Sequence, residues 1–519
     1  MARAIMIQGT ASYVGKSLVC AGLCRLFRQE GYRVAPFKAQ NMALNSFVTP
    51  HGGEIGRAQA AQAEAAGLEP TVDMNPVLLK PSTDVDAQVV LHGRVWGRVR
   101  AGDSDRYVAA AWPAVEVSYA RLAAAHDLIV IEGAGSPAEV NLRDRDIVNM
   151  RVAHLADAPV LLVGDIDRGG VFAALVGTLD LLPGVDRDRV RGFVINKFRG
   201  DLALLDAGLR FLEARTGRPV LGVIPYLPDL ALPEEDGVAA EAGAARRRGR
   251  DGAVRVGVVL LPHIANFTDF DALAAEPDVA LRYLACPEGV AGVDVTVLPG
   301  TKNTIGDLLW LRERGFAAAL ARHRASGGLM VGVCGGFQML GRRIEDPWRM
   351  ETDLGAVDGL GLLDVTTILG RDKATFRVVA RPLGDSPLAG AGPSEGYEIH
   401  LGETARGPSA APLFALRRMG GPGEEVLDGA MASDGRTWGT YVHGFLDGGP
   451  ARRAFANWVR VAKGLPPLDG PAGPPAAAAR SSAYDRLAAA LREHLDVAAL
   501  RSLAGVPLRK EVVPTLKPV

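Results

Sequence analysis

The run Ala4–Gln8 (AIMIQ) is followed by the turn Gly9–Ser17 (GTASYVGKS) and by the helical pattern of Leu18–Phe27. The run is almost continuously apolar, as in a strand that a parallel sheet covers on both faces. Small residues fill most of the turn, which ends in Lys16 and Ser17. A strand, a glycine-rich turn and a helix in this order begin a βαβ unit, so this stretch decides the fold.

The same alternation continues along the chain. Further strand-like runs lie at 32–37, 127–131, 159–164, 191–196 and 219–224. They predict an α/β fold whose N-terminal part, residues 1–232, is a doubly wound parallel sheet of P-loop type. A second set at 254–261, 295–298 and 329–333 predicts another α/β domain over residues 254–464. We expect residues 233–253, which include an arginine cluster, to be a linker, and residues 465–519 to hold a second linker and a helix over 482–500.

The composition is that of an ordinary globular protein. The 519 residues are 48% hydrophobic and 23% charged, and 58 basic residues against 59 acidic ones give a net charge of −1. This balance offers no general basic field for a nucleic acid or an anionic membrane. No apolar run approaches the ~18 residues of a membrane span, and the first residues lack the layout of a signal peptide, so we expect a cytoplasmic protein. Four cysteines without a C-x2-C pair suggest neither a disulfide framework nor a zinc site.

The opening turn has the features of a phosphate-binding loop. The small residues would let backbone N–H groups, including those around Gly9, Thr10 and Gly15, surround phosphate groups at the start of a helix. Lys16 would reach the β- and γ-phosphates, and the Ser17 hydroxyl would bind Mg²⁺. Five residues separate Gly9 from the Gly-Lys pair instead of the standard four. The loop therefore predicts a site for ATP and Mg²⁺, with an unusual spacing.

A second motif lies in the other half of the chain. The strand-like run 329–333 leads into Cys334-Gly335-Gly-Phe-Gln338, in which a cysteine stands at a tight turn before a helix. This layout predicts a nucleophile elbow, with the N–H of Gly335 available to an oxyanion. Far downstream, Tyr-Val-His443-Gly supplies a histidine that could act as the base for Cys334.

The phosphate loop resembles the loop of the dethiobiotin-synthetase type, whose enzymes activate a carboxylate with ATP. Two further positions agree with this resemblance. Glu132 follows the run 127–131 and would be a second Mg²⁺ ligand, and Asn196 ends the run 191–196 and would contact adenine.

The cysteine motif resembles the class I glutamine amidotransferase domain, in which the cysteine releases ammonia from the side chain of glutamine. The resemblance makes Cys334 the nucleophile, His443 the base and Gln338 a glutamine contact, and it assigns Gly300 to the loop that supplies the other oxyanion N–H. The acid that usually stands two residues after the histidine is replaced by Phe445. Candidates for an acid or partner that orients the histidine are Glu398 and His400.

Together, the two halves describe an ATP-dependent enzyme that makes amides from glutamine-derived ammonia. The order of motifs over nearly the whole chain resembles the cobyric acid synthase family. That family amidates the b, d, e and g carboxylates of adenosylcobyrinic acid a,c-diamide in cobalamin biosynthesis. The resemblance implies small-molecule partners only: the corrinoid, glutamine and ATP. Polar residues expected to line the substrate site are Lys38, Gln40, Asn41, Asn45, Asp165, Asp167 and Arg168.

Two alternatives remain at this point. Cobyrinic acid a,c-diamide synthases share both domains but amidate two other carboxylates, and the Lys38–Ser46 stretch favours the first family. ATPases of the chromosome-partitioning type usually carry a lysine early in the phosphate loop, where this chain has Gln8 and Thr10. The sequence does not indicate the oligomeric state, the order of amidation or the path of ammonia.

Overall fold

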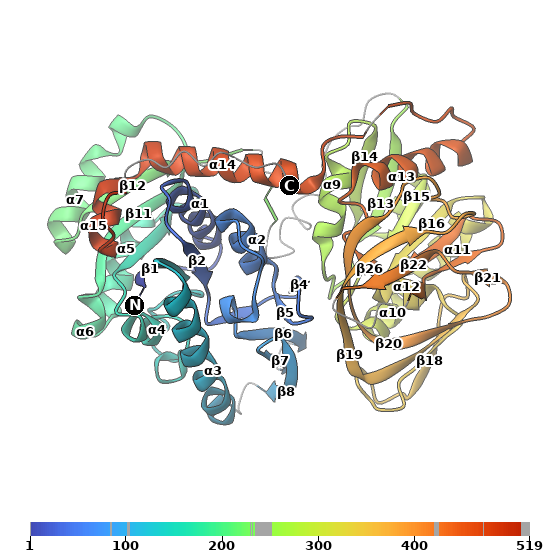
Figure 1. Cartoon of the computed structure of the whole chain (residues 1–519), viewed down its shortest axis with the longest axis horizontal. Helices are drawn as coiled ribbons and strands as arrows, with labels where there is room; N and C mark the ends of the chain where they lie inside the picture. Colours follow the sequence, from blue (N-terminus) through green and yellow to red (C-terminus); the bar gives the residue numbers. More distant parts are fainter. Residues whose placement is uncertain are drawn as a thin grey trace.

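The computed structural model describes residues 2–83, 86–100, 104–228, 230, 232–233, 252–419, 425–470 and 472–509. Most of the predicted linker 233–253, including the arginine cluster, therefore lies outside the described residues. Two lobes lie side by side (Figure 1). The first lobe comprises residues 2–233 and 476–509, and the second lobe comprises residues 252–470. Among the described residues, no helix is both long and apolar enough to cross a membrane.

A six-stranded parallel sheet forms the centre of the first lobe, which confirms the doubly wound sheet expected from the sequence. Its strand order is β12-β11-β10-β1-β9-β2, and each predicted run coincides with one strand. The strands are β1 (Arg3–Gly9), β2 (Val34–Phe37), β9 (Leu128–Glu132), β10 (Val160–Asp165), β11 (Val190–Phe198) and β12 (Val220–Pro225).

Helices cover both faces of this sheet. Successive residues of β1 alternate between two apolar clusters: Ala4 and Met6 belong to one, Ile5 and Ile7 to the other. The first cluster includes side chains of α3 (Ser104–Ala125), α4 (Met150–Leu155), α5 (Val171–Leu181) and α7 (Asp206–Thr216). The second includes side chains of α1 (Lys16–Gln29), α2 (Arg57–Ala66), α14 (Ala476–His494) and α15 (Val497–Ala504).

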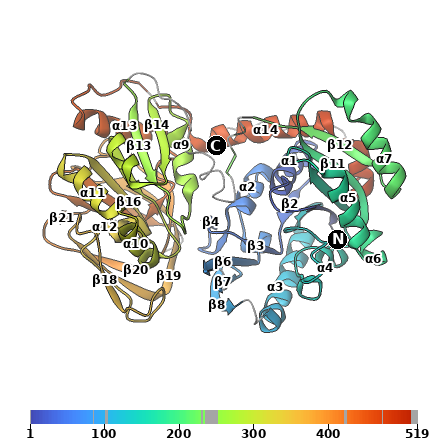
Figure 2. The same ribbon diagram turned by 180° about the vertical axis from the view of Figure 1, so that it is seen from behind.

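Short strands that the sequence analysis did not predict lie between β2 and α3. One sheet has the order β3-β6-β7-β8, and β4 pairs separately with β5. Their bounds are β3 (Gln40–Met42), β4 (Ser46–Val48), β5 (Glu54–Gly56), β6 (Val77–Thr83), β7 (Asp86–Leu91) and β8 (Arg94–Arg100). This insertion faces the second lobe (Figure 2). It therefore stands between the two candidate sites.

The second lobe is also α/β, as predicted, but only part of it is parallel. Parallel strands run in the order β14-β13-β15-β16-β25, and a largely antiparallel sheet has the order β18-β17-β19-β20-β26. The strands of the first sheet are β13 (Val254–Val259), β14 (Val279–Leu284), β15 (Val295–Leu298), β16 (Leu329–Val333) and β25 (Thr437–Thr440), with β24 (Ala430–Ala432) and β21 (Ala410–Ala411) at its edge. Those of the second are β17 (Arg343–Glu345), β18 (Ala356–Asp358), β19 (Val365–Pro382), β20 (Ser394–Arg406) and β26 (Val442–His443), with β22 (Phe414–Arg418) and β23 (Glu425–Asp428) beside β19. The helices are α9 (Asp271–Ala274), α10 (Thr304–Glu313), α11 (Phe316–Ala325), α12 (Gly335–Leu340) and α13 (Gly449–Ala462).

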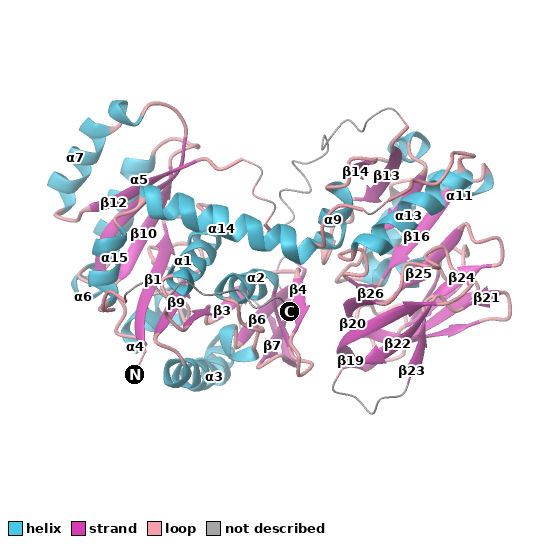
Figure 3. Ribbon diagram, turned by 45° about the horizontal axis from the view of Figure 1, so that its top comes forward, coloured by secondary structure: helices cyan, strands magenta, loops and turns pink. Residues whose placement is uncertain are grey.

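The C-terminal segment returns to the first lobe, where α14 crosses α1 (Figure 3). The single helix predicted over 482–500 is instead two helices, α14 and α15. The break follows from two contacts: Leu495 forms an antiparallel bridge with Gly222 in β12, and the Asp496 side chain accepts a hydrogen bond from the N–H of Ala499 at 2.8 Å. An N-cap of this kind starts a new helix.

Candidate functional site

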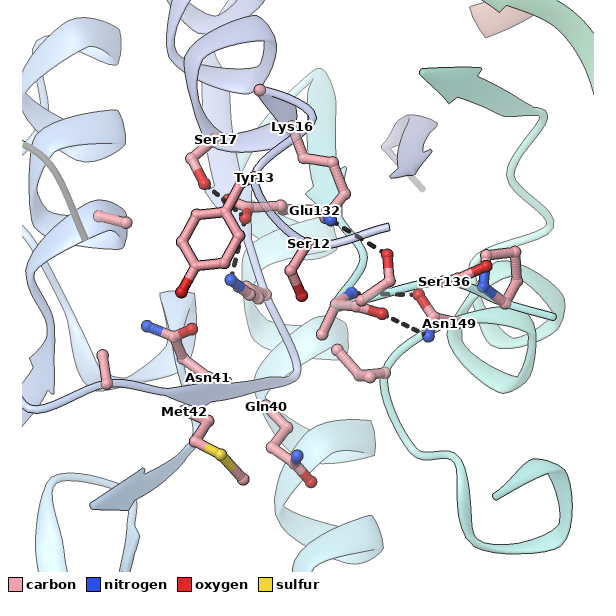
Figure 4. Close-up of a pocket in the computed structure, with 18 of the residues that line it drawn as sticks. Ser12, Tyr13, Lys16, Ser17, Gln40, Asn41, Met42, Glu132, Ser136 and Asn149 are labelled. Carbon is pink, nitrogen blue, oxygen red and sulfur yellow. Dashed lines mark hydrogen bonds and ion pairs between the residues drawn. The ribbon is translucent and has the colours of Figure 1, made fainter. Parts of the chain in front are cut away.

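The phosphate loop connects β1 to α1 and opens into a pocket of about 1780 Å³. Gly15 has φ 98°, and a Cβ at this position would overlap the amide of Asn196, so glycine is required here. The Lys16 ammonium donates to the backbone oxygens of Ala11 at 2.8 Å and of Gly135 at 3.0 Å. The loop is therefore folded around its lysine, with Lys16 and Ser17 on one side of the pocket (Figure 4).

Glu132 lies at the centre of this side of the pocket. It ends β9, is 1% exposed, and accepts hydrogen bonds from Ser17 Oγ at 2.8 Å, from Lys38 Nζ at 2.9 Å and from the amide of Gln62. Burial alone would raise the pKa of Glu132, but the Lys38 ammonium and these hydrogen bonds hold it below its usual value. The carboxylate is therefore ionised and fixed beside the phosphate loop.

The Ser17 hydroxyl and the Glu132 carboxylate fit a Mg²⁺ site. Both are hard oxygen donors that already touch each other, and Mg²⁺ in such sites takes one or two protein ligands together with phosphate oxygens and waters. The described residues hold no cluster of three or more His, Cys, Asp or Glu side chains that could bind a metal.

Residues at the ends of β10 and β11 contact or lie near the phosphate loop. Asn196 is 1% exposed, and its amide nitrogen donates to the backbone oxygen of Val14 at 2.9 Å, so it holds the loop in place. Its contact with adenine stays a prediction. Asp165 pairs with Lys197 at 2.7 Å, whereas Asp167 and Arg168 line the pocket.

The Lys38–Ser46 stretch belongs to the first lobe, and its residues contact either the pocket or the second lobe. Gln40 and Asn41 face the pocket opposite the phosphate loop (Figure 4), and the Gln40 side chain accepts a hydrogen bond from Tyr107 OH. Lys38 binds Glu132, as described above. Asn45 is buried and does not line the pocket, and Ser46 contacts the second lobe.

The predicted cysteine elbow is formed where β16 meets α12. Cys334 has φ 53° and ψ −112°, a strained conformation for a residue with a side chain. The packing next to Cys334 requires a glycine at position 336, because a Cβ there would overlap the backbone oxygen of Leu298. Cys334 is 8% exposed, and its Sγ lies 3.6 Å from the backbone oxygen of Ile399. The geometry is that of a nucleophile held at a sharp turn.

His443 lies beside this cysteine and is oriented by an acid that the sequence analysis missed. Its Nδ1 donates to Asp269 Oδ2 at 2.6 Å, and the other oxygen of Asp269 accepts the N–H of Gly444 at 3.1 Å. Burial alone would lower the pKa of His443, but the Asp269 carboxylate and the Cys334 sulfur raise it to about 10. Asp269 therefore fixes Nδ1 as the donor, so Nε2 is the nitrogen that could exchange a proton with Cys334.

This arrangement corrects the two candidates taken from the sequence. Across the strand pair β20–β26, Glu398 lies opposite Val442, and Tyr397 lies opposite His443. The Glu398 carboxylate pairs with Arg418 at 2.8 Å, with His400 3.6 Å away. The physical reason is strand alternation, which turns adjacent side chains of β20 to opposite faces. Phe445, at the usual position of the acid, is buried against Trp438. The signal that could have revealed Asp269 is the polar segment 263–269, which follows the strand β13 at the edge where β16 also ends.

The remaining predicted residues of this site adjoin the elbow. Gly300 packs so closely that a Cβ would lie 3.1 Å from His443 Cε1 and 3.6 Å from Cys334 Cβ. Gly335 begins α12 directly after the cysteine. Gln338 is 2% exposed, and its amide is bonded to the backbone oxygen of Leu401 at 2.8 Å and to Tyr441 OH at 3.0 Å. A contact between Gln338 and glutamine stays a prediction, because its side chain is held within the protein.

Comparison with known proteins follows the same division into two lobes. Residues 5–238 match the model of the CobQ/CobB/MinD/ParA nucleotide binding domain, and residues 255–451 match that of the CobB/CobQ-like glutamine amidotransferase domain. The chain is 52% identical over 518 residues to the cobyric acid synthase of Sorangium cellulosum (strain So ce56), which covers 97% of this chain and 99% of the relative. It is 51% identical over 502 residues to that of Salmonella typhimurium (96% and 97% covered) and 49% identical over 510 residues to that of Moorella thermoacetica (98% of each).

Both domains, in this order and over nearly the full length of each relative, are thus present in the chain. A phosphate loop that faces a buried carboxylate and a cysteine elbow with its histidine are the features that such an ATP- and glutamine-dependent ligase requires. We conclude that the chain belongs to the cobyric acid synthase family.

Proposed function

We propose that the chain amidates the b, d, e and g carboxylates of adenosylcobyrinic acid a,c-diamide, with ATP as activator and glutamine as nitrogen donor. The observation that carries the proposal is the pocket of about 1780 Å³, in which the phosphate loop faces Gln40 and Asn41. Pockets for drug-sized ligands hold roughly 300–1,000 Å³, so this one has room for a nucleotide beside a much larger second substrate.

The first lobe would perform the activation. A substrate carboxylate oxygen attacks the γ-phosphorus of ATP, ADP leaves, and an acyl phosphate forms. Lys16 and the N–H groups of the loop offset the phosphate charge, and Lys38 is positioned by Glu132 at the same side of the pocket. Ser17 and Glu132 would hold Mg²⁺, which would further offset the negative charge of the phosphates. Ammonia then attacks the acyl carbon and phosphate leaves.

The second lobe would supply the ammonia. Cys334 attacks the carboxamide carbon of glutamine while His443 Nε2 accepts the thiol proton, and the N–H groups of Gly335 and the Gly300 loop would bind the oxyanion. The protonated His443 returns its proton to the leaving nitrogen. Water then hydrolyses the thioester to glutamate. Asp269 keeps the imidazole in the required orientation throughout.

The insertion between the lobes is the proposed route of ammonia. Gly56 lies opposite Ser46 in the β4–β5 pair, next to Asn41 and Gln59. Gln59 is fully buried, and neither atom of its amide has a hydrogen-bond partner among the described residues; the Asn41 amide nitrogen also lacks one. Buried amide groups without partners are costly unless something binds them, and ammonia is a small polar molecule that could.

The test is to add adenosylcobyrinic acid a,c-diamide to the enzyme with ATP, Mg²⁺ and glutamine, and to measure phosphate release and product mass together. We expect release to be stimulated and the product to gain four amide-sized mass steps. Two steps on cobyrinic acid instead would identify a cobyrinic acid a,c-diamide synthase. Glutamate formation without stimulation or mass change would retain the glutaminase and refute the corrinoid substrate.

A further inference from the structure

Ser46, in the first lobe, is linked to His443 of the second lobe through two side chains, Asn266 and Tyr397. Its backbone N–H donates to Asn266 Oδ1 at 3.0 Å, and its backbone oxygen accepts a hydrogen bond from Tyr397 OH at 3.4 Å. Asn266 and Tyr397 both touch His443: Asn266 Nδ2 lies 3.4 Å from His443 Nε2, and the Tyr397 ring stacks on the imidazole with centroids 5.2 Å apart. All four residues are at most 4% exposed.

The contact with Ser46 determines which end of the Asn266 amide faces the histidine. A backbone N–H can bind only the amide oxygen, so the NH₂ group must point at His443. Asn266 is held in the left-handed region, with φ 54°, in the segment that leads from β13 to Asp269. The orientation of this amide in the second lobe is therefore set by a strand of the first lobe.

An NH₂ group at Nε2 opposes the first step of glutamine hydrolysis. Nδ1 is committed to Asp269, so the lone pair of Nε2 is the one that must accept the proton of Cys334. A donor on that lone pair competes with the thiol and repels a protonated Nε2. The Cys334 thiol, in turn, points to the backbone oxygen of Ile399, which can accept a hydrogen bond from a thiol but not from a thiolate. Both contacts favour the neutral Cys334 thiol and the neutral His443 imidazole over a thiolate and an imidazolium. The Asp269 carboxylate has the opposite effect, because it favours the imidazolium.

We propose that Asn266, oriented by Ser46, is a positioning residue that restrains His443 until the first lobe is loaded. The proposal rests on the Cys334–His443 glutaminase proposed above. A path for the signal is present in the same insertion: β4 pairs with β5, β5 leads into α2, and Gln62 of α2 donates to Glu132 beside the phosphate loop. A shift of this segment when ATP and substrate bind would move Ser46, free the Asn266 amide and let Nε2 accept the proton.

The test compares Asn266→Gly with the wild-type enzyme. Glycine adopts the left-handed backbone readily, so the fold is preserved while the NH₂ group is lost. Without ATP or corrinoid, we expect iodoacetamide to alkylate the Cys334 peptide about three- to tenfold faster, the equivalent of one hydrogen bond, and glutamate release to rise with it. With all substrates present, the variant should form more glutamate per amide, and ATP with corrinoid should stimulate its glutaminase far less than that of the wild type.

Asn266→Asp is the second variant, since it retains an oxygen for Ser46 and lacks the NH₂ group; it should change alkylation in the same direction. Asp271→Asn, at an exposed position of the same segment, is the matched control and should leave all rates unchanged. Slower or unchanged alkylation in both Asn266 variants would overturn the restraint. Glutamate release that persists in Cys334→Ala would instead refute the proposed glutaminase, so the two failures are distinguishable.

Discussion

The acid that orients His443 lies 174 residues before it in the chain, and the glutaminase should depend on this acid. Asp269→Asn keeps the size of the side chain but removes the charge that holds Nδ1 as a donor. We expect glutamine-dependent amidation to fall about 10²–10⁴-fold, as when the acid of a catalytic triad is neutralised. Amidation with ammonium chloride should be preserved. Glutamate release and product mass, measured with each nitrogen source, check both statements.

Glu398→Gln is the matched control, since Glu398 is one of the two candidates taken from the sequence and its carboxylate binds Arg418. We expect it to retain most of the glutaminase activity. The reverse result, with Glu398→Gln inactive and Asp269→Asn active, would contradict the site as described.

At the scale of residues, the sequence predicted the parts of the site that local motifs carry. Cys334, Lys16 and Ser17 each stand in a strand–turn–helix pattern that fixes their position. Asp269 could not be found in this way, because its role depends on β13 and β26 meeting in space. Asn196 shows a related limit: its place at a strand end was predicted, but not that its amide supports the phosphate loop.

At the scale of elements, α14 should stabilise the first lobe although it follows the second lobe in sequence. Leu491 is fully buried and packs on α1 at Gly22, where a Cβ would overlap its side chain. Leu491→Ala should lower the free energy of unfolding by about 2–5 kcal/mol, the usual cost of truncating a buried leucine. Denaturant unfolding followed by circular dichroism measures this change.

Leu204→Ala serves as the control for this experiment, because Leu204 is 86% exposed and should cost less than ~0.5 kcal/mol. Equal stability of the two variants would mean that α14 is dispensable for the fold.

The length of an element decided whether it could be predicted from the sequence. Long apolar runs such as β9 and β10 were found from sequence, whereas strands of three residues such as β3, β4 and β5 carry too little pattern. Two of these short strands, β4 and β5, contact the second lobe.

At the scale of the whole molecule, the two lobes meet through charges as well as through Ser46. Glu54 of β5 accepts hydrogen bonds from Lys80 at 2.7 Å in its own lobe and from Lys373 at 2.6 Å in the second lobe. Burial lowers the pKa of Lys373 to about 7, and the Glu54 carboxylate opposes that effect. A buried charge pair that joins two lobes fixes their register, since separation would leave Glu54 without one of its partners. The same strand pair, β4–β5, carries Gly56, which lies on the proposed ammonia route.

Gly56→Ala tests this route. A Cβ at this position would overlap the amides of Asn41 and Gln59, although the backbone, with φ −62°, accepts alanine. With glutamine labelled with ¹⁵N in its amide and excess unlabelled ammonium present, a sheltered route gives the wild-type product mostly ¹⁵N. In Gly56→Ala we expect the ¹⁵N fraction to fall several-fold while glutamate release continues, because ammonia released in the second lobe then mixes with solvent before it reaches the proposed acyl phosphate. Gly97→Ala, where a Cβ meets no atom within 4 Å, is the control and should keep the wild-type fraction. An unchanged ¹⁵N fraction in Gly56→Ala would place the route elsewhere between the lobes, since the isotope ratio reports the origin of the nitrogen and not the overall rate.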